Sequence, residues 1–166
     1  MPYWQLFYHL VWSTKNREPL LTPQVEPIVY GFLRSKAIGL GATLFALNGT
    51  VEHVHMVAAI PPAIAVAKFV GQIKGVSAAK FNKGGFSAIL YWQEEYGAFS
   101  FDGKRLPNFV AYVERQKEHH AQNKTIPVLE RTADGGVKLA REGAPMYEVG
   151  GLSWWDELAT WEGFSL

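Results

Sequence analysis

Two apolar runs joined by Asn-Gly are the feature that most constrains the fold of this chain. TLFAL (43–47) and VEHVHMVAAI (51–60) have the length of strands, and a Pro-Pro pair ends the second run. Asn48 and Gly49 lie between them, and both tolerate the positive φ that tight hairpin turns require. The sequence therefore predicts an antiparallel hairpin over the two runs.

The other elements follow from the spacing of apolar residues. Aromatic and β-branched stretches indicate strands, whereas apolar residues at intervals of three and four indicate helices. We expect, besides the hairpin, a strand at 3–14, a helix from Thr22-Pro23 to Gly39 or Gly41, a helix at 63–81, short strands at 88–93 and 96–101, a helix at 106–122 and a short aromatic segment at 153–164. This order predicts an α+β sandwich, an antiparallel sheet with helices packed on one face and a further helix at the C-terminal end.

Positive charge is concentrated in the N-terminal part of the chain. Residues 1–124 hold 13 Lys or Arg against 8 Asp or Glu, whereas residues 125–166 hold 3 against 7. We therefore expect one mildly basic domain at 1–124, followed by an acidic, tryptophan-containing extension at 125–166. Basic side chains attract phosphates, but this excess alone is weak evidence for a nucleic-acid partner.

The chain contains no cysteine, which excludes disulfides and thiolate metal sites. No basic segment precedes an apolar stretch at the N-terminus, and prolines and histidines interrupt the long uncharged runs. The sequence therefore predicts neither a signal peptide nor a membrane span, and we expect a cytoplasmic protein without a membrane partner.

His53 and His55 lie one residue apart in the second run of the hairpin. Alternate residues of a strand point to the same face, so both imidazoles point the same way, opposite to Val54 and Met56. Two neutral imidazoles on one face can bind a single cation. A bare His-x-His pair also matches by chance, and hydrogen bonding to neighbours is then the more frequent explanation.

The helix at 106–122 offers further groups. Tyr112 and Gln116 are four residues apart, so they share one helical face. Gln116 supplies an uncharged oxygen ligand, and the phenol of Tyr112 becomes a useful nucleophile only with help from a cation or a base. Alternatively, the tyrosine packs in the core and the glutamine is solvated. For His119 and His120 the favoured interpretation is a solvated last turn, where positive charge complements the helix dipole.

Five ordered blocks give the chain a family resemblance. They are HLVWSTKNREPLLTP, EHVHM, IKGVSAAKF, YWQEEYGAFSF and YVERQKEHH. In this order, over roughly residues 5–122, the sequence resembles the single-tyrosine HUH transposases. That family includes small insertion-sequence transposases, which move DNA as a single strand, and REP-associated tyrosine transposases.

The resemblance implies a ferredoxin-like or RRM-like fold and a specific chemistry. His53 and His55 match the two histidines of the HUH motif, Gln116 matches the third metal ligand, and Tyr112 matches the catalytic tyrosine. A divalent cation, Mg²⁺ or Mn²⁺, is then expected to activate a phosphate of single-stranded DNA next to a hairpin. The tyrosine would form a 5′-phosphotyrosine link, and attack by another 3′-hydroxyl would rejoin the strands.

The resemblance also suggests DNA contacts and an assembly. Lys15 and Arg17 match a basic pair after the first strand, and Lys74 and Ser77 match a recurring lysine and serine, all four expected near DNA. Insertion-sequence members form homodimers that exchange the tyrosine helix, and Gly103 before this helix offers a hinge. We therefore expect a homodimer.

Three alternative functions remain. The first is a catalytically inactive relative that binds DNA hairpins, although both histidines, the tyrosine and the glutamine are present. The second is a metal hydrolase with water as its nucleophile, which would not need a tyrosine one turn before a ligand. The third is an RNA-binding module, but the chain lacks the aromatic strand motif of RRM domains.

Overall fold

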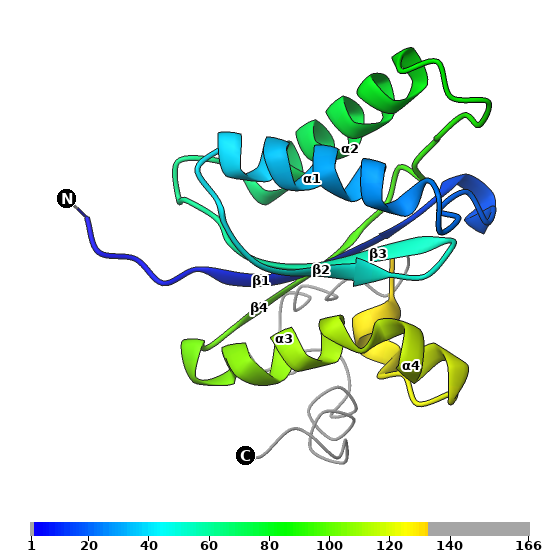
Figure 1. Ribbon diagram of the computed structural model, residues 1–166. Coiled ribbons are helices and arrows are strands. Elements are labelled where there is room, and N and C mark those ends of the chain that lie inside the picture. Colours follow the sequence, from blue (N-terminus) through cyan, green and yellow to red (C-terminus); the bar gives the residue numbers. More distant parts are fainter. Residues whose placement is uncertain (1, 133–166) are drawn as a thin grey trace, which may run out of the picture.

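The computed structural model describes residues 2–132 of the chain. Four antiparallel strands form one sheet with the order β2-β3-β1-β4 (Figure 1). The elements are β1 (Phe7–Ser13), η1 (Lys15–Arg17), α1 (Glu26–Gly39), β2 (Thr43–Gly49), β3 (His53–Ala59), α2 (Val66–Lys83), β4 (Gly97–Phe101), η2 (Gly103–Arg105), α3 (Leu106–Glu114), α4 (Gln116–Ala121) and η3 (Pro127–Glu130). The predicted α+β fold is confirmed. The aromatic segment expected at 153–164, and most of the extension expected at 125–166, lie outside the described residues.

Helices cover both faces of the sheet. α1 and α2 pack together on one face, whereas α3, α4 and η3 lie on the other (Figure 1). The first face carries a core of fully buried aliphatic and aromatic side chains, among them Leu10, Trp12, Met56, Phe69 and Ile73. The spacing of apolar residues in α2 predicts a helix with one apolar face, and in the structure this face packs against the core.

β1 is one of the two inner strands, and its pairing sets which residues face α3 and α4. It pairs with β3 on one side, where Val11 lies opposite His55 and Ser13 opposite His53. It pairs with β4 on the other side, where His9 lies opposite Phe99. Directly opposed residues project to the same face, so β1 and β3 together present their histidines towards α3 and α4.

The predicted hairpin forms, but its turn lies further along the chain. Asn48 and Gly49 belong to the β2–β3 ladder, opposite His55 and Val54, and neither has a positive φ. Position 49 needs glycine because the backbone of His53 lies very close to it: a Cβ on Gly49 would lie 2.1 Å from the carbonyl oxygen of His53. Thr50, the first residue of the actual turn, donates its N–H to the same carbonyl at 2.9 Å.

The strand expected at 88–93 is not formed. This segment makes a single isolated bridge, between Thr14 and Trp92. The side chain of Asn82 instead satisfies both backbone groups of Leu90, donating to its carbonyl at 2.9 Å and accepting from its N–H at 2.7 Å. A side chain that occupies these groups competes with a strand ladder, and the segment therefore follows α2 as a loop.

The helix expected at 106–122 is divided into α3 and α4. Arg115, between them, has φ −100° and ψ 19°, outside the helical range. The chain then turns back through Asn123, whose φ is 53°, and brings residues 126–130 under the sheet. Gly97 makes room for this return, because a Cβ there would lie 2.1 Å from the carbonyl oxygen of Arg131.

Candidate metal and nucleophile site

The two histidines of β3 share one face of the sheet, as predicted. His53 and His55 are buried beneath α3 and α4, with ring centroids 5.0 Å apart. Val54 and Met56 point to the opposite face, into the core below α1 and α2. The alternation of β3 therefore separates two imidazoles from the aliphatic core while keeping both out of bulk solvent.

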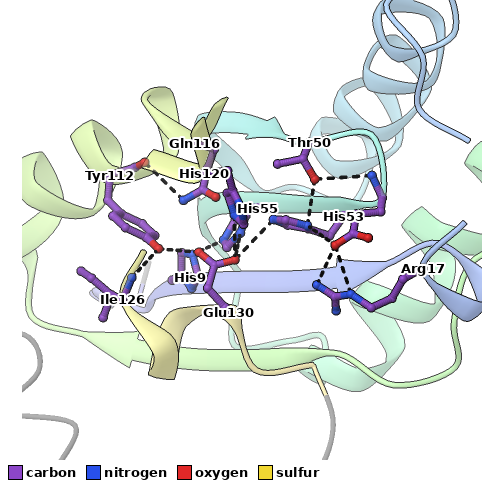
Figure 2. A network of polar contacts seen from close by, with 11 residues as sticks. His9, Arg17, Thr50, His53, His55, Tyr112, Gln116, His120, Ile126 and Glu130 are labelled. Atoms are coloured by element: carbon purple, nitrogen blue, oxygen red, sulfur yellow. Dashed lines mark hydrogen bonds and ion pairs between the residues drawn. The ribbon is translucent and has the colours of Figure 1, made fainter. Parts of the chain in front are cut away.

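Tyr112 of α3 lies over these histidines. Its side chain is fully buried, and its ring centroid is 6.1 Å from that of His55. The hydroxyl donates to Oε1 of Glu130 and accepts from the backbone N–H of Ile126 at 3.0 Å (Figure 2). Burial, followed by the neighbouring Glu130 carboxylate, raises the pKa of Tyr112 above its ordinary value. The phenol is therefore protonated at neutral pH in this state.

Glu130 joins the tyrosine to the histidines. While Oε1 accepts from Tyr112, Oε2 lies 3.1 Å from Nε2 of His55 and 3.3 Å from Nε2 of both His53 and His120 (Figure 2). Burial acts to raise the pKa of this carboxyl, but hydrogen bonds from His53 and His55 outweigh it and hold the pKa well below its usual range. Glu130 is thus a carboxylate anion in the centre of the site.

The helical face of Tyr112 continues through Gln116 to His120, each four residues on. Gln116 is fully buried: its Nε2 donates to the carbonyl of Tyr112 at 3.4 Å, and its Oε1 has no hydrogen-bond partner among the described residues. The ring centroid of His120 is 4.6 Å from that of His53. His119 stacks on the ring of Tyr112, with centroids 5.1 Å apart. The expectation of a solvated last turn was therefore wrong, because the chain after α4 folds back over it.

His9 of β1 lies behind the site. Its Nε2 is 2.9 Å from Nδ1 of His55, and the residue is fully buried. Burial, followed by the neighbouring His55, holds the pKa of His9 well below its ordinary value, and burial also lowers the pKa of His55. Both imidazoles are therefore neutral, and the proton between them is carried by one ring nitrogen only.

The donor set of this site suits a divalent cation. His53, His55, His120 and Glu130 each offer one ligand atom, and these atoms lie within 4.8 Å of one another. The unpartnered amide oxygen of Gln116 adds a buried acceptor nearby. Neutral imidazole, carboxylate and amide oxygen are all ligands for divalent first-row metals, so the residues fit the cation that the sequence suggested.

The four residues expected near DNA fall into two groups. Lys74 and Ser77 lie in the interior, only 8% and 0% exposed. Nζ of Lys74 donates to the carbonyls of residues 93–95, and Oγ of Ser77 accepts from Nε1 of Trp92 at 3.0 Å. This pair therefore anchors the loop that follows α2.

Lys15 and Arg17 are exposed on η1 at the end of β1. Arg17 forms an ion pair with Glu52 at 3.0 Å, beside the first histidine of β3. The side chain of Arg17 therefore borders the site, and Lys15 lies two residues before it on the same exposed element. Of the four, only these two present charge to solvent.

Sequence reasoning missed three residues of the site. His9 is 46 positions from its partner His55, and Glu130 is 75 positions from it. No local pattern marks either contact. His120 did carry a signal, since it follows Gln116 by four residues on one helical face.

Comparison with known proteins places residues 2–116 within the model of a family described as IS200-like transposases. The ISDra2 transposase TnpA of Deinococcus radiodurans is 32% identical over 77 residues, which cover 46% of this chain and 55% of that protein. The transposase of insertion sequence IS200 from Salmonella typhimurium is 28% identical over 98 residues, covering 59% and 57%. The chain thus spans little more than half the length of these curated relatives.

Two solved structures share the fold. One, of a putative transposase from Deinococcus radiodurans, superposes with a TM-score of 0.56 at 23% identity, covering 75% of this chain and 95% of that one. The other, of a REP-associated tyrosine transposase bound to a REP hairpin, has a TM-score of 0.53 at 13% identity and covers 75% and 76%. Among the described helices, none is long and apolar enough to cross a membrane.

Proposed function

Because the chain belongs to the IS200-like transposase family, we propose that it cleaves and rejoins single-stranded DNA next to hairpins with Tyr112 as its nucleophile. The observation that carries this proposal is the position of the Tyr112 hydroxyl. One carboxylate, that of Glu130, links it to His53 and His55. The nucleophile and the cation-binding groups therefore belong to one buried network.

We assign His53, His55 and Gln116 to a divalent cation, Mg²⁺ or Mn²⁺. Both histidines present Nε2 to the same point, and the amide oxygen of Gln116 is buried without a partner in the described part of the chain. A cation bound there would withdraw charge from the scissile phosphate in the transition state. The imidazoles are suited to hold it because burial keeps His55 neutral.

In the proposed reaction, the oxygen of Tyr112 attacks phosphorus. The bond from phosphorus to the 3′-oxygen breaks, the 5′-phosphate stays on the tyrosine, and the leaving oxygen takes up a proton as a free 3′-hydroxyl. The phenol proton must leave during the attack, because the raised pKa of Tyr112 keeps the hydroxyl protonated. It already faces Oε1 of Glu130. Rejoining reverses these steps, with one phosphodiester exchanged for another.

For the substrate we propose single-stranded DNA with hairpins, as in the REP-associated relative, whose structure contains a REP hairpin. Lys15 and Arg17 are the proposed phosphate contacts, because they are exposed beside the site. The homodimer expected from the family stays a prediction. Within one chain, the ring centroids of Tyr112 and His55 lie 6.1 Å apart, so a single chain can bring the tyrosine and the histidines together.

A covalent-adduct assay tests this function. An oligonucleotide with a hairpin from the DNA flanking the gene is incubated with the protein and Mn²⁺, then separated on a denaturing gel that retains protein. We expect an adduct with the wild type and none with Tyr112→Phe or His53→Ala. Tyr91→Phe is the matched control, because Tyr91 is 55% exposed and outside the site, and it should form the adduct normally.

The other outcomes of this assay identify the alternatives. Tight hairpin binding without any adduct would indicate an inactive DNA-binding relative. Strand cleavage that persists in Tyr112→Phe would indicate a hydrolase that uses water. Either result overturns the proposed role of Tyr112.

A further inference from the structure

Four ligand atoms converge on one point of the site, and two of them lie outside the His-x-His pair and Gln116. Nε2 of His120 and Oε2 of Glu130 are 3.3 Å apart, and the same oxygen lies 3.3 Å from Nε2 of His53 and 3.1 Å from Nε2 of His55 (Figure 2). Three imidazole nitrogens thus surround a single carboxylate oxygen. Atoms that meet so closely can reach one cation with small shifts, because metal–nitrogen bonds are about 2.0–2.2 Å long.

The charge of this cluster also favours a cation. Glu130 is only 15% exposed, and the ion pairs of the described residues give it histidines as its only partners. The nearby Arg17 pairs with Glu52, and Lys117 pairs with Glu26. In the described part of the chain neither lysine nor arginine pairs with Glu130, and a bound cation would balance this carboxylate, because buried charges are paired or coordinate metals.

Glu130 is held in place by packing. Ile126, Val128 and Leu129 are 3%, 4% and 1% exposed, and they share a core with Val57 and Val113. The N–H of Leu129 also bonds the carbonyl of Ile126 at 2.9 Å, which closes η3. A ligand on an element fixed in this way meets the others without a large ordering cost.

We propose that Glu130 and His120 are two further ligands of the divalent cation, which they bind together with His53 and His55. The proposal rests on the proposed function, since it concerns the same cation. Its ligand class is a divalent first-row transition ion, such as Mn²⁺, that accepts both imidazole and carboxylate. The single carboxylate balances part of the ion's charge, and it connects the ion to the hydroxyl of Tyr112.

This assignment gives Glu130 an influence on the nucleophile as well. Its Oε1 accepts the hydrogen bond of the Tyr112 hydroxyl. A carboxylate that shares its charge with a cation is a weaker acceptor for this bond, so the hydroxyl is held less firmly once the cation is present. The occupancy of the metal site and the freedom of the nucleophile are then coupled through one side chain.

Manganese binding to the full chain tests the proposal without any DNA. The signal of free Mn²⁺ in electron paramagnetic resonance falls as the ion binds, which gives the affinity directly. We expect binding to the wild type and a strong loss in His53→Ala. Glu130→Gln and His120→Ala should each weaken binding by roughly tenfold or more. Glu118→Gln is the matched control, because Glu118 is exposed on α4 and its carboxylate accepts a hydrogen bond from Gln122 alone among residues 2–132, and its affinity should equal that of the wild type.

Two results would overturn the proposal, and they can be told apart. Wild-type affinity in Glu130→Gln and His120→Ala, with loss in His53→Ala, removes the two extra ligands and leaves the proposed function intact. If adduct formation also rises in Glu130→Gln, the carboxylate of Glu130 restrains the Tyr112 hydroxyl through their hydrogen bond and does not bind the cation. Absence of Mn²⁺ binding by the wild type removes the cation site altogether. His120 is 32% exposed, so His120→Ala supplies a result even if Glu130→Gln does not fold.

Discussion

The two faces of the sheet are built from the same strands and are chemically opposite. Below α1 and α2, β3 contributes Val54 and Met56 to a core of apolar side chains. Below α3 and α4, the same strand contributes His53 and His55 to a buried network of imidazoles, phenol and carboxylate (Figure 2). Burial of apolar surface stabilises a fold, whereas burial of polar groups costs free energy unless each finds a partner.

The comparison shows where the structure places its stability and its chemistry. The first face is a core of mainly apolar side chains, so a change of side-chain volume there lowers stability. Both faces contain buried polar atoms without a hydrogen-bond partner among the described residues: Nε1 of Trp12 and the hydroxyl of Tyr30 on the first, and Oε1 of Gln116 and Nδ1 of His9 among those of the second. Only on the second face does such an atom, Oε1 of Gln116, accompany a group of imidazole and carboxylate ligands, where a bound ion would complete the site. The faces should therefore respond to mutation independently.

The largest expected effect on stability belongs to the apolar face. Met56→Ala removes a fully buried side chain, and we expect the free energy of unfolding to fall by about 2–5 kcal/mol. Chemical denaturation measures this change. Ile38→Ala is the control, because Ile38 is 57% exposed on α1, and it should change stability by no more than about 0.5 kcal/mol. Mn²⁺ affinity of folded Met56→Ala should be unchanged; a large loss would show that the faces are not independent.

A smaller effect, confined to the reactive face, is expected for His9. When Nε2 of His55 binds a cation, Nδ1 carries the proton and donates to Nε2 of His9, 2.9 Å away. His9→Leu removes this acceptor, and we expect Mn²⁺ affinity to fall by roughly 10–100-fold. His9→Gln places an amide where Nε2 lies and should recover most of the affinity. Equal affinities in both variants would mean that His9 only fills space.

Much of this contrast could be predicted from the sequence. The period of two along β3 separates His53 and His55 from Val54 and Met56, and this separation follows from strand geometry alone. The spacing of four between Tyr112 and Gln116 likewise fixes their shared face. Local periodicity was therefore sufficient to predict which face a side chain points to, because that direction depends only on the geometry of its own strand or helix.

The rest depends on contacts between distant segments. Glu130 reaches the histidines because the chain reverses at Asn123, in a left-handed conformation, and because Leu129 packs in the second core. Neither step leaves a pattern near residue 130. The family resemblance suggested that Lys74 lies near DNA, whereas three backbone carbonyls of the following loop accept its protons. A sequence does not distinguish these two environments.

The smallest expected effect separates an exposed lysine from this buried one. Lys15 lies on the surface beside the site, whereas Lys74 is 8% exposed. If Lys15 contacts a phosphate, Lys15→Ala should weaken hairpin binding and reduce the slope of log affinity against log salt concentration by about 1. Lys74→Met should leave that slope unchanged, since its ammonium is engaged by the protein. Fluorescence anisotropy with a labelled hairpin at several salt concentrations measures both. A reduced slope in Lys74→Met would place DNA over the loop at 93–95, and the basic surface would then extend beyond the rim of the site.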